Sequence, residues 1–66
     1  MQLSLKTARR RRRLTLQALA QKAGMNKSTV SRIENGKVKP LHESVLALED
    51  ALDYKHGTLV FREVQA

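Results

Sequence analysis

Residues 16–36, LQALAQKAGMNKSTVSRIENG, decide the fold of this chain. The apolar residues of the first half recur at helical spacing and form one stripe: Leu16, Leu19, Ala20 and Ala23. Thr15 is a good N-cap for this helix, and Gly24 ends it because glycine readily adopts the positive φ of a tight C-terminal turn. The stretch therefore opens with a short amphipathic helix that stops at Gly24.

A second helix follows the turn at once. Asn26 can cap it, Val30 and Ile33 are its inward pair, and Asn35-Gly36 ends it. Ala20 stands where the two helices must cross closely, and a larger side chain there would push them apart. Two short helices that cross at a tight turn make a helix-turn-helix.

The match to the master pattern of this motif is complete at the constrained positions: Leu19, Ala20, Ala23, Gly24, Met25, Val30 and Ile33. It continues in Leu14-Thr15, in the exit loop with Pro40, and in the apolar spacing of Val45, Leu48, Ala51 and Leu52. Over about residues 5–60 the chain thus resembles the Cro/cI-type (lambda-repressor-like, XRE-type) family. The resemblance implies an all-α bundle of four to five short helices and a single DNA-binding domain over residues 1–66, with the helix-turn-helix at 16–36.

Length and composition restrict the other classes. A chain of 66 residues makes one small domain with a marginal core, so a homodimer would be no surprise. There is no cysteine, no apolar run of membrane-spanning length and no signal-peptide core, which favours a soluble intracellular domain. The resemblance further implies a cytoplasmic, nucleoid-associated protein of bacterial or phage origin. We expect no cofactor and no metal, because His42 and His56 have no clustered ligands around them.

Charge is divided unevenly along the chain. Residues 1–39 carry 11 Lys and Arg against one acidic residue, a net +10, whereas residues 40–66 carry 2 against 5, a net −3. The positive part contains the helix-turn-helix, as expected for a surface that binds double-stranded DNA. The acidic part is expected to face a second subunit or a protein partner. Its helix around Glu49 and Asp50 also leaves open an alternative, in which the chain activates transcription by contacting polymerase there.

The DNA-contacting residues are assigned by resemblance, which makes the helix at about 27–35 the recognition helix. Its outward side chains are the candidate base contacts: Asn26, Lys27, Ser28, Ser31 and Arg32. The candidate phosphate contacts are Gln17, Thr29, Asn35, Lys37, Lys39, Arg10 and Arg13. The family usually places its phosphate-binding glutamine one position earlier, where this chain has Leu16, and Thr29 is equally well explained as a helix-surface residue.

The first helix is expected over residues 3–13, with Leu5 and Ala8 inward and the arginine run Arg9–Arg13 at its end. Arg10–Arg13 are the phosphate candidates of this run, although helix geometry cannot turn all of them to DNA. The resemblance assigns Arg9 a different role, a structural ion pair with Glu34. Arg13 replaces a common glycine, so it is expected to tolerate positive φ at a small cost.

The tail, residues 54–64, allows two interpretations. Family spacing favours a fifth helix with Leu59 and Val60 inward, while the run Thr58–Val64 is rich in strand formers and two copies could pair as a small sheet between subunits. In either case the expected dimer-interface residues are Tyr54, Leu59, Phe61 and Val64.

The sequence is compatible with three classes of function to different degrees. The favoured one is a dimeric, sequence-specific transcriptional repressor on a pseudo-palindromic operator. The alternative is an antitoxin that represses its own operon and binds a toxin protein. An enzyme is disfavoured, because the sequence offers no nucleophile–base pair, paired carboxylates or phosphate loop.

Overall fold

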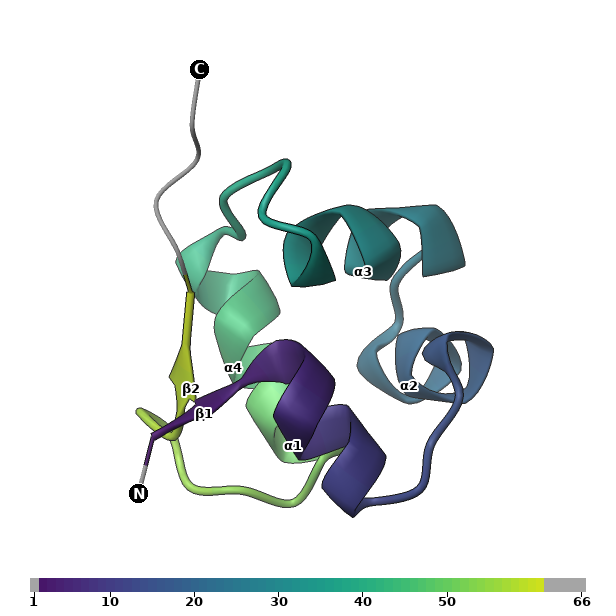
Figure 1. Ribbon diagram of the computed structural model, residues 1–66. Helices are drawn as coiled ribbons and strands as arrows, with labels where there is room; N and C mark the ends of the chain where they lie inside the picture. Colours follow the sequence, from purple (N-terminus) through teal and green to yellow (C-terminus); the bar gives the residue numbers. More distant parts are fainter. Residues whose placement is uncertain (1, 62–66) are drawn as a thin grey trace.

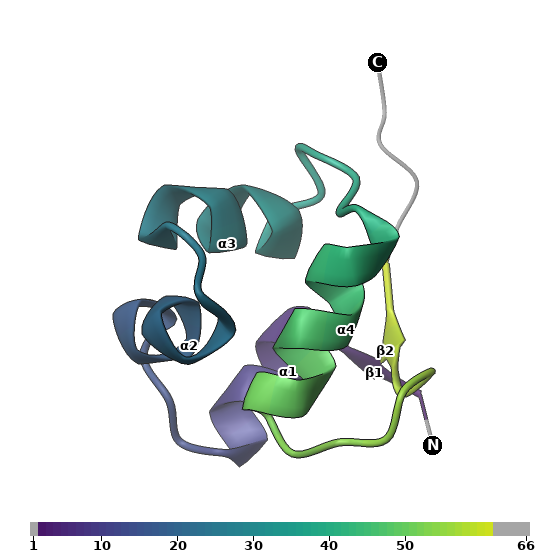
Figure 2. The same ribbon diagram turned by 180° about the vertical axis from the view of Figure 1, so that it is seen from behind.

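The computed structural model describes residues 2–61, and this part contains four helices, with one short strand before them and another after them in the sequence (Figure 1). In chain order the elements are β1 (Leu3–Ser4), α1 (Leu5–Arg11), α2 (Leu16–Ala23), α3 (Lys27–Glu34), α4 (His42–Ala51) and β2 (Leu59–Val60). The α2–α3 pair lies at one end of the molecule and the two strands lie at the other, as Figures 1 and 2 show.

Local signals set the boundaries of the helix-turn-helix as the sequence predicts. The Thr15 hydroxyl caps α2 by accepting a hydrogen bond from the Ala18 amide at 3.0 Å. Gly24 has φ of 69°, and this left-handed turn allows the Met25 amide to donate to the Ala20 carbonyl at 2.8 Å. The chain therefore turns sharply between α2 and α3.

One apolar core joins the helices and the strands. Its buried members are Leu3, Leu5, Ala8, Leu19, Ala20, Val30, Ile33, Leu48, Leu52 and Leu59. Helix α2 packs against both α3 and α4, and Ala20 is 2% exposed within this junction. Ala20 thus occupies the place where the sequence requires a small side chain.

The prediction for the first helix is wrong at both ends. Helix α1 covers only Leu5–Arg11, and Ser4 caps it by accepting a hydrogen bond from the Thr7 amide at 3.2 Å. Leu3 is in a strand because its amide donates to the Thr58 carbonyl at 2.8 Å. At the other end, Arg13 adopts φ of 56°, a conformation in which the helix cannot continue.

The predicted fifth helix is also wrong for the part of residues 54–64 that the structure describes. Residues 54–61 contain no helix, and Leu59–Val60 form strand β2. This strand pairs in parallel with β1 of the same chain, with Leu3 opposite Leu59 and Ser4 opposite Val60. The strand-forming residues of the tail therefore pair with the N-terminal strand of the same chain.

Candidate nucleic-acid interface

Helix α3 presents one apolar and one polar side. Val30 and Ile33 are buried against the rest of the bundle, which leaves the opposite side of the helix to solvent. The predicted base-contacting residues Asn26, Lys27, Ser28 and Arg32 are all exposed there. The side of α3 that could enter a major groove therefore contributes no side chain to the core.

The first turn of α3 has an unusual cap. Asn26 is in the N-cap position, yet its side chain makes no capping hydrogen bond. Among the base candidates Ser31 differs, because it is half-buried and its hydroxyl lies 3.4 Å from Asn35 Nδ2, a weak hydrogen bond. The side chain of Asn26 is therefore available to a ligand, while Ser31 and Asn35 are tied to each other.

The N-terminal ends of α2 and α3 meet at one shallow hollow. Its lining residues are Arg9, Thr15, Leu16, Gln17 and Lys27. Gln17, a candidate phosphate contact, and Lys27, a candidate base contact, are thereby brought to the same place. Both side chains are exposed, so an amide donor and an ammonium group can approach one DNA backbone together.

The remaining phosphate candidates are distributed around this face. Lys37 and Lys39 are exposed in the loop between α3 and α4, Asn35 is exposed at the end of α3, and Thr29 is half-buried within it. Arg10 and Arg13 are exposed at the end of α1. All of these except Thr29 are therefore exposed to solvent.

Arg9 and Glu34 form an ion pair at the C-terminal end of α3. Arg9 Nε is 2.7 Å from Glu34 Oε2, and Arg9 Nη2 is 3.2 Å from Glu34 Oε1, so the contact is bidentate. Arg9 Nη1 also donates to the Leu14 carbonyl at 2.8 Å. The side chains are 14% and 5% exposed, so this pair ties α1 and the approach to α2 to the end of α3.

Arg12 has a role that sequence reasoning missed, because it was counted among the phosphate candidates. Its Nε and Nη2 donate to the carbonyls of Leu52 at 2.8 Å and Asp53 at 3.2 Å, beyond the C-terminal end of α4. Its guanidinium also lies 4.0 Å above the centre of the Tyr54 ring. These contacts hold Arg12 on α4, and nothing in the local sequence of the arginine run distinguishes it from its neighbours.

Glu49 is the second residue that the sequence did not explain. It is fully buried, and its Oε2 accepts hydrogen bonds from the amides of Gly57 at 2.8 Å and Leu59 at 3.1 Å. The idea that Glu49 and Asp50 form an acidic contact surface is therefore wrong for Glu49. Asp50 is exposed, and its Oδ1 lies 2.8 Å from His56 Nε2.

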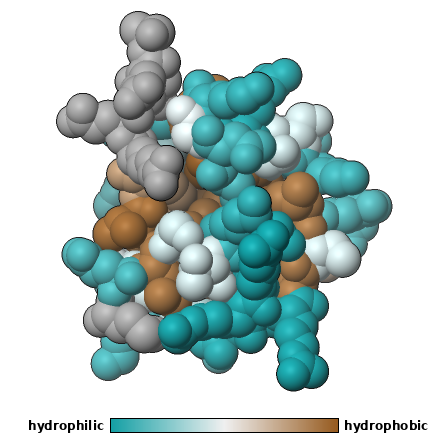
Figure 3. All heavy atoms as spheres, in the orientation of Figure 1, coloured by the Kyte–Doolittle hydropathy of each residue, from teal (hydrophilic) through white to brown (hydrophobic). Residues whose placement is uncertain are grey.

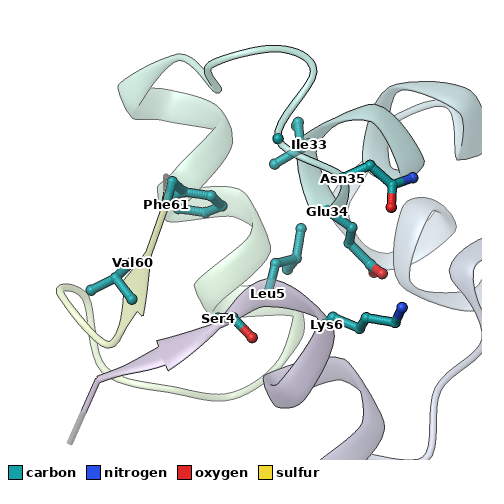
Figure 4. A pocket seen from close by; sticks show the side chains of 9 residues that line it. Ser4, Leu5, Lys6, Ile33, Glu34, Asn35, Val60 and Phe61 are labelled. Atoms are coloured by element: carbon teal, nitrogen blue, oxygen red, sulfur yellow. The ribbon is translucent and has the colours of Figure 1, made fainter. Parts of the chain in front are cut away.

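The residues expected at a dimer interface have mixed positions. Leu59 is buried in the core of its own chain, whereas Tyr54 and Phe61 are half-buried and pack against that core. Val64 lies outside the described residues. In Figure 4 the Phe61 ring points towards Leu5 and Ile33, while Val60 projects away from them. The three described residues therefore do not form one exposed patch.

Figure 3 shows that hydrophilic residues cover most of the face seen there, with apolar residues both on the side of the strands and on the side of α2 and α3. No helix among the described residues is long and apolar enough to cross a membrane. Lys22 of α2 and Lys27 and Arg32 of α3 are exposed, so the end of the molecule that holds these two helices carries basic side chains.

Comparisons with known proteins agree with this geometry. Residues 5–59, most of the chain, match the model of the helix-turn-helix family HTH_3, the Cro/cI or XRE type. No curated protein and no solved structure matches the chain. The chain belongs to the Cro/cI-type helix-turn-helix family of DNA-binding transcription regulators.

Proposed function

We propose that the chain is a repressor that binds a pseudo-palindromic DNA operator as a homodimer. The observation that carries this proposal is the exposed N-terminal turn of α3, where the Asn26 side chain makes no capping bond and Lys27 and Ser28 are open to solvent. A turn of this kind beside the N-terminal end of α2 suits insertion into a major groove.

Affinity and specificity are assigned to different side chains. Lys37, Lys39 and Gln17 neutralise or bind phosphates, which gives salt-dependent affinity for any sequence. Lys27 and Arg32 suit the O6 and N7 atoms of guanine, and Asn26 suits adenine, at about 1–3 kcal/mol for each good bidentate contact. The recognition helix therefore supplies discrimination and the surrounding cations supply binding.

A dimer is proposed because one short recognition helix reads too few base pairs to select a site in a genome. Two copies on one side of the duplex would place their α3 helices about 34 Å apart, in successive major grooves. An operator with two-fold symmetry follows from that arrangement. Occupation of such a site over a promoter excludes polymerase, which is the simplest route to repression.

The test is selection of bound sites from a random duplex library, at about 0.15 M salt so that non-specific binding is suppressed. Enrichment of two symmetric half-sites, about 10 base pairs apart from centre to centre, is the expected result. A single asymmetric site would contradict the dimer. Salt-sensitive binding without any motif would contradict independent sequence recognition, and would favour the antitoxin alternative, in which a partner protein is needed.

A further inference from the structure

The described residues that were expected at a dimer interface form no exposed patch, so pairing of two copies requires another apolar surface. Among the described residues, three large apolar side chains are exposed: Val38 by 37%, Leu41 by 67% and Val60 by 42%. Val38 and Leu41 lie between α3 and α4, and Val60 lies on β2, whose end is beside the start of α4 in Figures 1 and 2. These side chains therefore lie at one corner of the molecule, and Leu41 is the most exposed of them.

Leu41 occupies the N-cap position of α4, where leucine is unfavourable. Its φ of −67° and ψ of 154° are those of an ordinary N-cap, and its carbonyl accepts a hydrogen bond from the Val45 amide at 3.0 Å. Its side chain makes no capping bond, whereas serine, threonine, aspartate or asparagine at this position could accept one. Leucine here thus forgoes a capping bond and leaves its apolar side chain in water, and contact with another molecule would bury that side chain.

The charges on either side of Leu41 favour a second copy of the chain as the partner. Lys39 stands two residues before Leu41 and Glu43 two residues after it, and both side chains are exposed. A two-fold axis at Leu41 sets two copies of this segment in opposite directions, so that Lys39 of each copy approaches Glu43 of the partner subunit. The segment is therefore complementary to itself, with two opposite-charge contacts around an apolar centre. We call it the Leu41 patch, and its members are Val38, Lys39, Leu41 and Glu43.

We propose that two copies of the chain pair through the Leu41 patch. This inference rests on the proposed function, because it names the surface that joins the two copies on an operator. The Lys37 amide donates to the Arg32 carbonyl at 2.9 Å, which folds the start of the loop back onto the end of α3. The patch thus follows the C-terminal end of α3, and pairing there leaves the N-terminal turns of both α3 helices open to DNA.

The size of the patch predicts a weak dimer in solution. A few side chains bury far less than the roughly 1,200–2,000 Å² of a stable interface. Free chains should therefore be mostly monomeric at micromolar concentration, with pairing detectable near about 1 mM. Two copies on neighbouring half-sites have a high effective concentration, so the same contact should make their binding to an operator cooperative.

Exchange of the two charges tests the pairing, and it is measured without DNA because Lys39 is also a candidate phosphate contact. Lys39→Glu and Glu43→Lys each place like charges at both contacts of a homodimer, whereas an equal mixture of the two variants restores opposite charges at both. NMR dilution series, with one variant isotopically labelled in the mixture, give the dissociation constants. Each variant alone should dissociate about tenfold more readily than the natural chain, and the mixed dimer should recover the natural constant.

Two outcomes of this experiment would overturn the proposal. Dissociation constants that the single variants leave unchanged would mean that the two charges do not meet. A mixture that stays as monomeric as its components would exclude a two-fold contact at Leu41, and would leave a different protein as the occupant of the patch.

Leu41→Ser separates the apolar contact from the stability of the fold. Serine can cap α4, so this variant should melt at a higher temperature than the natural chain, yet its dimer should dissociate at least about tenfold more readily. A general loss of structure cannot produce both changes. Gln21→Ser, at an exposed position of α2, is the matched control and should leave the dissociation constant of the dimer unchanged.

Operator binding distinguishes failure of this inference from failure of the proposed function. On a symmetric operator, Leu41→Ser should reduce the cooperativity between the two half-sites about tenfold and leave the affinity for a single half-site unchanged. Unaltered cooperativity would refute the Leu41 patch and leave the dimeric repressor intact. Absence of any symmetric operator would refute the dimeric repressor, while the charge variants would still decide whether the patch pairs.

Discussion

Removing the carboxylate of Glu34 should destabilise the domain more than removing any exposed carboxylate. Glu34→Ala deletes both bonds of the bidentate pair, 2.7 Å and 3.2 Å long. Among the described residues, the guanidinium of Arg9 then keeps the Leu14 carbonyl as its hydrogen-bond partner. Breaking a fully buried pair by removing one partner costs about 3–5 kcal/mol. Because Arg9 is 14% exposed and keeps one hydrogen bond, we expect a loss of about 2–3 kcal/mol.

The assay is denaturant unfolding followed by circular dichroism, with thermal melts in parallel. A loss of that size in a domain this small lowers the melting temperature by about 10–20 °C. Glu43→Ala, exposed in the first turn of α4, is the matched control and should change stability by less than about 1 kcal/mol, the most that a carboxylate there gains from the helix dipole. A free energy of unfolding for Glu34→Ala equal to that of Glu43→Ala would refute the argument, because the pair would then contribute nothing. The double variant with Arg9→Ala should be less destabilised than the sum of the single variants, since no charge is left unpaired.

Three further outcomes are expected. Arg32→Ala should weaken binding to the selected operator by about 1–3 kcal/mol and relax the base preference at one base pair of each half-site, whereas Lys37→Ala should weaken binding to operator and random duplexes alike and reduce the salt slope by about 1. Fluorescence anisotropy titrations at several salt concentrations distinguish these two effects. Equal losses of affinity on both DNAs for Arg32→Ala would show that Arg32 does not contact a base. Arg12→Ala should lower the free energy of unfolding by about 1–2 kcal/mol and change the near-ultraviolet circular dichroism of Tyr54, the single tyrosine. The salt dependence of DNA affinity should stay the same. A weaker salt dependence would mean that Arg12 contacts a phosphate after all. Thr15→Ala should cost about 1 kcal/mol of unfolding free energy, and Thr15→Ser should restore most of it, because the hydroxyl that caps α2 is kept.

The helix-turn-helix could be predicted because its determinants are local. Each helix carries its own apolar stripe, Thr15 and Gly24 mark the two ends of α2 through hydrogen bonds a few residues long, and Ala20 satisfies a steric requirement that only a small side chain meets. The exposed positions of Asn26, Lys27, Ser28 and Arg32 follow from the same periodicity. Their contacts with DNA stay predictions.

The ends of the chain were decided by tertiary contacts. Leu3 and Leu59 are neighbours in the sheet although 55 residues separate them in the sequence, and no local pattern signals a parallel pairing over that distance. The tail sequence suits a strand, whereas family spacing favoured a helix. The strand forms because the Leu3 amide donates a hydrogen bond to the Thr58 carbonyl and the Glu49 carboxylate accepts one from the Leu59 amide. A two-residue strand has too few hydrogen bonds to form without such partners.

In the arginine run, Arg9–Arg13, the sequence again predicts one part of the structure and tertiary contacts decide the rest. Charge alone predicts a basic helix end, and the sequence correctly determines its sign and place. The tertiary structure assigns Arg9 to Glu34 and Arg12 to the end of α4, and leaves Arg10 and Arg13 exposed. Identical side chains acquire different roles because each points in a different direction around α1 and its terminal turn, and only the packed bundle determines which groups they meet.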